Sequence, residues 1–160
     1  MAVLTLALLG RPQIVVDDQP VELKSQKAQA LFYYLVMARQ SHSRQSLAGR
    51  LWSDLDEAAA RRNLRVELLK LRAAVDEHDE YLESSRETIG LNLQSDYRLD
   101  VERFEQCLHG HEPTFEELQE AVELYRGEFL EDFHIRDAPL FEEWVTNERE
   151  RLSQMARQAT

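Results

Sequence analysis

The sequence of 160 residues has one cysteine, few glycines and no long apolar run. Cys107 cannot form an internal disulfide and lies in no Cys-x-x-Cys motif, so we expect a reducing cytoplasm and no cysteine-based metal site. Its 5 glycines form neither a P-loop nor a G-x-G-x-x-G loop. The longest apolar run, residues 1–9, is shorter than the roughly 20 residues that span a bilayer, and it lacks the basic start of a signal peptide. These absences predict no cofactor, no metal and no membrane partner.

The chain also lacks an excess of basic residues, and its net charge is −11. Such a charge argues against a nucleic-acid binder, whose binding surface is usually basic. The acidity is unevenly distributed, however. Residues 1–95 hold 12 Lys and Arg against 13 Asp and Glu, a net of −1, whereas residues 96–160 hold 7 against 17, a net of −10. We therefore expect two domains, 1–95 and 96–160, of which only the second is strongly acidic.

The first of these parts has the pattern of an α+β domain. Residues 1–24 predict three short strands that form a small antiparallel sheet, divided by turns at Gly10-Arg11-Pro12 and Asp17-Asp18-Gln19-Pro20. A β-hairpin is expected over residues 81–93. Between them, apolar residues at helical spacing predict three helices over residues 26–39, 44–51 and 58–75. A sheet, three helices and a hairpin are the outline of a winged helix-turn-helix domain with the hairpin as its wing.

From residue 96 onward the pattern is helical only. Asp100 is predicted to cap one helix, and Thr114 with Glu117 has the capping-box pattern that opens a second. A last helix carries Phe141 and Trp144. Antiparallel helix pairs of this kind build helical-repeat arrays, and two or three helices are too few for a stable array. The sequence therefore predicts either a truncated all-α repeat domain or helices that pack on the first domain.

The predicted helix 58–75 carries the candidate site. It holds five basic residues and one acidic residue, a local charge of +4. Basic rows on both flanks of a helix in the major groove can reach both phosphate walls, and an arginine facing the groove can read guanine. The side chains predicted to contact bases are Arg62, Val66 and Leu69. Those predicted to contact phosphates are Arg61, Asn63, Arg65, Lys70 and Arg72. A merely solvated basic face would explain the arginines, but it explains the outward Val66 and Leu69 less well; they favour contact with DNA or with a protein.

Two neighbouring segments complete the candidate interface. At the hairpin tip, Arg86 and Thr88 are candidates for a wing that contacts a minor groove or phosphates. The loop before helix 58–75 is acidic and would repel phosphate, so we expect it to face a protein or solvent. Its candidate residues for a protein contact are Ser53, Asp54, Asp56 and Glu57.

An enzyme is a weaker hypothesis. Adjacent carboxylates such as Asp54 and Asp56, or Glu142 and Glu143, are the residue types of acid–base catalysis. Neighbouring residues of a helix point in different directions, however, and no nucleophile, metal cluster or glycine loop accompanies them. His109 and His111 are too few for a metal site. We therefore expect no enzymatic activity.

Several segments resemble known bacterial regulators. The segments QKAQALFYYLVMA (26–38), RQSLAGRLWSD (44–54) and NLRVELLKLRAAV (63–75) resemble the OmpR/PhoB-type winged helix. The segments YRGEFLEDF (125–133) and FEEWVTNERERL (141–152) resemble the start of the bacterial transcriptional activator domain, a tetratricopeptide-like module of regulators of the antibiotic-regulatory-protein type. The region around Trp144 and the Leu51-Trp52 dipeptide are the most specific parts of the likeness.

This resemblance implies a sequence-specific activator that binds repeated half-sites of double-stranded DNA upstream of promoters. It implies that helix 58–75 is the recognition helix, that 81–93 is the wing, and that the loop from Ser53 to Glu57 touches RNA polymerase. It further implies a cytoplasmic protein of the bacterial nucleoid, which pairs as a homodimer on DNA. The alternative is a protein-interaction module whose winged helix no longer binds DNA, as the outward Val66 and Leu69 and the acidic net charge suggest.

Overall fold

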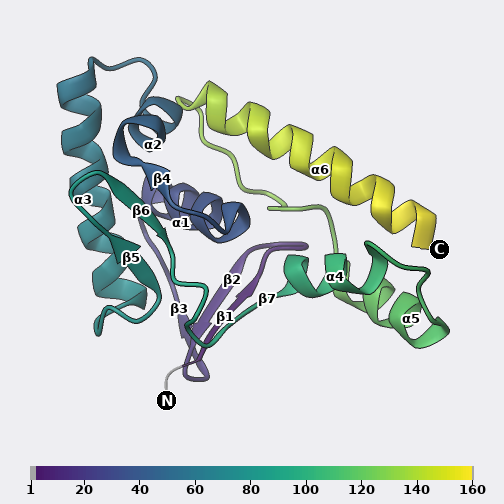
Figure 1. The fold of residues 1–160 in the computed structure, drawn as a ribbon. Coiled ribbons are helices and arrows are strands. Elements are labelled where there is room, and N and C mark those ends of the chain that lie inside the picture. The colour runs from purple at the N-terminus through teal and green to yellow at the C-terminus, as the bar shows by residue number, and fades with distance from the viewer. Residues whose placement is uncertain (1–2, 160) are drawn as a thin grey trace.

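The computed structural model describes residues 3–159 as an α+β fold (Figure 1). The strands are β1 (Leu4–Ala7), β2 (Gln13–Val16), β3 (Gln19–Val21), β4 (His42–Ser43), β5 (Leu82–Ser84), β6 (Thr88–Leu91) and β7 (Tyr97–Leu99). The helices are α1 (Gln26–Ala38), α2 (Arg44–Leu51), α3 (Glu57–Val75), α4 (Asp100–Leu108), α5 (Phe115–Leu124) and α6 (Pro139–Ala159). Figure 1 shows α3 and the β5–β6 hairpin at one end of the molecule and α4 and α5 at the other.

The N-terminal sheet has the strand order β3-β2-β1-β7. The three predicted strands pair antiparallel, as expected, but β7 adds to β1 in parallel, with Leu4 opposite Tyr97 and Leu6 opposite Leu99. The predictions of a purely antiparallel sheet and of helices only after residue 95 are therefore wrong. The N–H groups and carbonyls along the free edge of β1 need partners, and the chain returns after residue 95 to supply them.

A second sheet, β4-β6-β5, contains the predicted hairpin. Its third strand, β4, lies where the sequence predicts only a break between two helices, and it pairs antiparallel with β6, with His42 opposite Ile89. Gly90 of β6 lies directly against this segment. A Cβ atom there would stand 2.9 Å from the Cα atom of Ser41, so the close approach of the two backbones requires a glycine.

The three predicted helices of the first part are present, with two boundaries shifted by one residue: α1 ends at Ala38, before its C-cap Arg39, and α3 begins earlier than predicted. The side chains of Ser25 and Ser43 cap the N-termini of α1 and α2. Helix α3 begins at Glu57, one residue earlier than predicted, because the carboxylate of Asp56 accepts a hydrogen bond from the Ala59 N–H at 2.8 Å. Its net charge is therefore +3. Helix α1 lies in the middle of the fold, with its residues from Ala30 to Val36 buried.

The C-terminal segment packs on the first part of the chain, which was one of the two expectations. Helix α6 contacts α2, and the ring of Trp144 lies edge-on to Tyr34 of α1 with a centroid distance of 4.8 Å. Residues 128–131 exchange backbone hydrogen bonds with Leu8 and Gly10 at the end of β1. The structure thus joins residues on both sides of position 95 into shared packing, and the division into domains at that position remains a prediction.

Asp100 has a different role from the predicted helix cap. It is the first residue of α4, and its carboxylate accepts hydrogen bonds from the backbone N–H groups of Leu8 and Leu9 at 2.9–3.0 Å as well as from Val101. Burial raises the pKa of this carboxyl, while the three N–H donors and Arg126 oppose the rise. Asp100 therefore fastens α4 to the end of β1.

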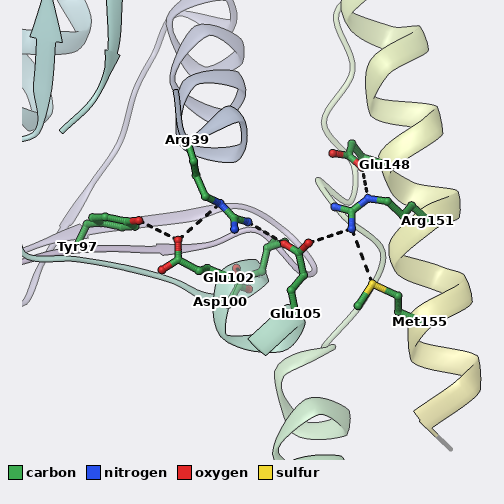
Figure 2. Close-up of polar contacts among 9 residues, drawn as sticks. Arg39, Tyr97, Asp100, Glu102, Glu105, Glu148, Arg151 and Met155 are labelled. Atoms are coloured by element: carbon green, nitrogen blue, oxygen red, sulfur yellow. Dashed lines mark hydrogen bonds and ion pairs between the residues drawn. The ribbon is translucent and has the colours of Figure 1, made fainter. Parts of the chain in front are cut away.

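Charged side chains also connect α1, α4 and α6 (Figure 2). Glu105 of α4 accepts hydrogen bonds from Arg39 at 2.7 Å and from Arg151 at 3.0 Å. Arg39 lies 3.6 Å from Glu102, which accepts a hydrogen bond from the Tyr97 hydroxyl. The network holds the C-terminal end of α1 to the two later helices.

Candidate nucleic-acid interface

Helix α3 presents one face to the core and the opposite face to solvent. Leu64, Leu68, Leu71 and Val75, which recur at helical spacing, are all buried and form the core-facing side of the helix. Helices α1 and α2 pack against this side of α3. The opposite face of α3 is exposed to solvent.

The three residues predicted to contact bases lie on that free surface. Arg62 is exposed, and the side chains of Val66 and Leu69 are 48% and 65% exposed. Steps of four and three residues place all three on one stripe of the helix. Val66 and Leu69 are thus exposed apolar side chains one turn apart, beside the exposed Arg62.

Basic side chains flank the stripe, and one of them was missed from the sequence. Arg61 and Arg65 are exposed on α3. Arg44, at the first position of α2, faces the same group: its pKa is lowered by burial and by the positive charges of Arg65, Arg72 and Arg61. Mutual repulsion of this kind is relieved when an anion binds. The sequence could have indicated Arg44 through its position, because it is the first residue of α2, directly after the Ser43 cap.

Arg72 is placed differently from the other predicted phosphate contacts. Its guanidinium donates hydrogen bonds to Asp79 at 2.9 Å and to Ser84 at 2.6 Å, and it lies 3.4 Å from Asp76. Only 18% of this side chain is exposed. Arg72 thus connects the end of α3 to β5 and is not available in the way that Arg61 and Arg65 are.

The two remaining predicted phosphate contacts differ from one another. Asn63 is exposed near the start of α3. Lys70 forms an exposed ion pair with Glu67 at 3.1 Å, and Glu67 in turn accepts a hydrogen bond from Ser25, the cap of α1. Lys70 therefore has a competing carboxylate beside it.

The hairpin tip is ordered by its own hydroxyl groups. Ser85 and Thr88 share a hydrogen bond of 2.9 Å between their hydroxyls, and the Ser85 hydroxyl also accepts from the backbone N–H of Glu87. Arg44 donates to the carbonyl of Ser85 at 3.1 Å, so α2 holds the tip. Arg86 is exposed at this tip. Thr88 thus has a hydrogen-bond partner within the hairpin, while Arg86 is exposed to solvent.

The acidic loop between α2 and α3 is exposed from Ser53 to Asp56. Two of its four predicted contact residues have a role in the helix itself. Asp56 caps α3, and Glu57 lies in its first turn, where a negative charge interacts favourably with the helix dipole. Asp54 is exposed beside Leu55, which is 39% exposed.

No helix within residues 3–159 is long and apolar enough to cross a membrane. Over the same residues, no group of three or more His, Cys, Asp or Glu side chains is arranged to hold a metal ion. His111 instead lies 3.0 Å from Glu117, at the capping box of α5.

Comparison with known proteins shows that the fold of this chain is similar to that of a solved structure. No family model matches the chain, and no curated protein matches its sequence. A solved structure of Mycobacterium tuberculosis EmbR, in complex with a low-affinity phosphopeptide, is similar with a TM-score of 0.71 and 23% sequence identity. The similarity covers 99% of this chain and 46% of the EmbR chain. The chain thus has the fold of a part of EmbR and spans about half of its length.

Proposed function

We propose that the chain is a sequence-specific, DNA-binding transcriptional activator that places α3 in the major groove. The observation that carries the proposal is the exposed face of α3, where Arg62, Val66 and Leu69 form a stripe between basic side chains. Arginine can form two hydrogen bonds to guanine, and apolar side chains can contact thymine methyl groups. The likeness of the whole chain to the EmbR fold and the resemblance to OmpR/PhoB-type activators support the same function.

Phosphate contacts come from both sides of the stripe in this proposal. Arg61 and Arg65 on α3 and Arg44 on α2 carry unneutralised charge toward the duplex, with Asn63 as a hydrogen-bond donor and Lys70 as a weaker contact. The β5–β6 hairpin serves as the wing, with Arg86 at its tip. Arg72 positions this wing relative to α3 and is not itself a phosphate contact.

The acidic C-terminal helices act on proteins and not on DNA. Figure 1 places α4 and α5 at the end of the molecule opposite α3, where their negative charge would not oppose a duplex bound at α3. The exposed Asp54 and its loop form a surface for RNA polymerase. The protein works at the cytoplasmic nucleoid, occupies promoter repeats as a homodimer and has no catalytic function.

Salt dependence and sequence preference test the DNA contacts. With about 4–6 phosphate contacts, a plot of log affinity against log salt concentration should have a slope near −4 to −5. Arg62→Ala should relax sequence preference, whereas Arg65→Ala should weaken binding to all sequences alike and flatten the slope by about one unit. Glu83→Gln, at an exposed position of β5, is a control for general charge effects. The proposal fails if the chain binds no promoter fragment from genomic footprinting.

A second function rests on Val66 and Leu69. A protein-interaction module that no longer binds DNA would use the same exposed apolar stripe to bind another protein. Hydrogen exchange of α3 separates the two functions. Protection by a duplex favours the activator, and protection by a protein partner with none from DNA favours the interaction module.

A further inference from the structure

A groove lies between α2 and α6, away from the basic cluster on α3. It has a volume of about 510 Å³ and is lined by Gln45, Ser46, Gly49, Arg50, Leu140, Glu143, Trp144 and Asn147. Arg50 stands six residues after Arg44 on α2, which turns it to a different side of the helix. The groove is therefore a separate surface from the candidate DNA interface.

Arg50 is the chemically unusual residue of this groove. Its guanidinium carbon lies 4.6 Å from the centre of the Tyr34 ring, so one face of the guanidinium makes a cation–π contact with the ring. Its Nε is buried without a partner, and none of its nitrogens has a hydrogen bond or ion pair among residues 3–159. A guanidinium offers five donors in a planar fork that matches a carboxylate. The groove thus presents an unused carboxylate-binding group.

Apolar surface adjoins this guanidinium. Leu140, in the first turn of α6, is 46% exposed, and Trp144 lies one turn further along the same helix. A fitting occupant combines a carboxylate with a neighbouring aliphatic side chain. Glu143 also lines the groove, so an occupant with many negative charges is disfavoured.

The chain itself carries such a segment. Asp54 and Leu55 are adjacent and exposed in the loop between α2 and α3, and Asp54 has no hydrogen bond or ion pair within the described residues. The loop follows α2 directly, after Trp52, so the loop and the groove adjoin on one molecule. Two copies related by a two-fold axis can therefore form two identical contacts, because the loop of each copy can bind in the groove of the other.

We propose that the α2–α6 groove binds the Asp54-Leu55 loop of a second copy of this chain. Asp54 pairs with Arg50 of the other copy, and Leu55 packs on Leu140 and Trp144. Two contacts of this size bury less than a typical stable interface, so we expect a weak dimer with a dissociation constant of about 10–100 µM. This dimer does not depend on DNA, and while it persists the loop is not free to contact a polymerase.

Charge-reversed variants of the full chain test this pairing by sedimentation equilibrium without DNA. Arg50→Glu and Asp54→Arg should each weaken self-association at least tenfold, because each homodimer then faces like charges twice. An equal mixture of the two variants should associate as well as the unchanged chain, since both contacts of the mixed dimer again join opposite charges. Glu143→Gln, which removes the like charge beside the docked carboxylate, should strengthen association.

The mixture of the two variants separates a lost contact from a misfolded variant. A variant that merely misfolds cannot be rescued by the other, and Asp54 makes no contact on which the fold depends. A chain that stays monomeric up to about 500 µM, a mixture that fails to associate, or variants that associate as well as the unchanged chain would overturn the proposal.

Discussion

At the scale of single residues, His42 makes the stability of the fold depend on pH. Its Nε2 is buried without a hydrogen-bond partner, and its ring lies 5.2 Å from that of Tyr34, on which Arg50 also rests. Burial, and then the charge of Arg50, lowers the pKa of His42 below its usual value of 6.5. The unfolded chain therefore takes up this proton at a higher pH than the folded chain does. The contribution of His42 to stability is fully present above about pH 6.5 and decreases as the pH falls toward the lowered pKa.

We expect His42→Asn to reduce this loss of stability, because asparagine takes up no proton. The free energy of unfolding, measured by urea titration at several values between pH 7 and pH 5, should fall less steeply for the variant. His78→Asn, the same substitution at an exposed position, is the control variant. Equal slopes for His42→Asn and the original chain would show that His42 does not govern the effect.

Helical periodicity was sufficient to place the exposed stripe of α3, because Arg62, Val66 and Leu69 follow from the spacing of the buried leucines. It could not place Arg72. The partners of that side chain, Asp79 and Ser84, lie 7 and 12 residues further along, beyond the end of the helix. Only the path of the chain after Val75 decides whether this arginine faces a duplex or the protein.

At the scale of elements, Asp76 controls the connection from α3 to β5. It is 2% exposed and accepts hydrogen bonds from the backbone N–H groups of Glu80, Tyr81 and Leu82 at 2.7–3.0 Å. Asp76→Asn replaces one of the two acceptor oxygens with an NH2 group, which leaves at least one of these N–H donors without an acceptor, and we expect a loss of about 2–3 kcal/mol in the free energy of unfolding. Asp79→Asn, at a side chain that is 79% exposed, should cost about 0–1 kcal/mol. Similar losses for both variants in urea titrations would contradict this role.

Two glycines in different elements should respond in opposite directions to alanine. Gly49 in α2 has open space where a methyl group would stand, with no atom within 4 Å, so Gly49→Ala should stabilise the chain by about 0.5–1 kcal/mol through its helix propensity. Gly90→Ala should destabilise it, because the methyl group would lie 2.8 Å from the Ser41 hydroxyl. Thermal unfolding followed by circular dichroism measures both changes. A stabilising Gly90→Ala would show that β4 can move away from β6 freely.

The three helices between residues 26 and 75 were predicted within one residue at each end, whereas β4 and β7 were missed. Two or three residues cannot display a period, and nothing local marks them as strands. Their conformation is set by partners far along the chain: His42 opposite Ile89, and Tyr97 opposite Leu4.

At the scale of the whole molecule, we expect one cooperative unfolding transition. The chain has two tryptophans, Trp52 after α2 and Trp144 in α6, so Trp144→Phe and Trp52→Phe each leave one reporter in a different part. In each variant the midpoint from tryptophan fluorescence should coincide with that from far-ultraviolet circular dichroism, because the parts share a sheet and the packing of α6 on α2. Separate transitions would instead favour independent domains divided near residue 95.

The parallel pairing of β1 with β7 also means that the sheet cannot be completed until late in the synthesis of the chain. Leu4 cannot pair with Tyr97 until Tyr97 has been synthesised. At roughly 5–20 residues per second, the ribosome needs about 5–20 s to make the intervening chain. Local partners β2 and β3 are available within the first seconds, but the other edge of β1 stays open to foreign strands throughout this interval. The vulnerability of the nascent chain therefore depends on how fast it is translated, and pausing before residue 97 would prolong it.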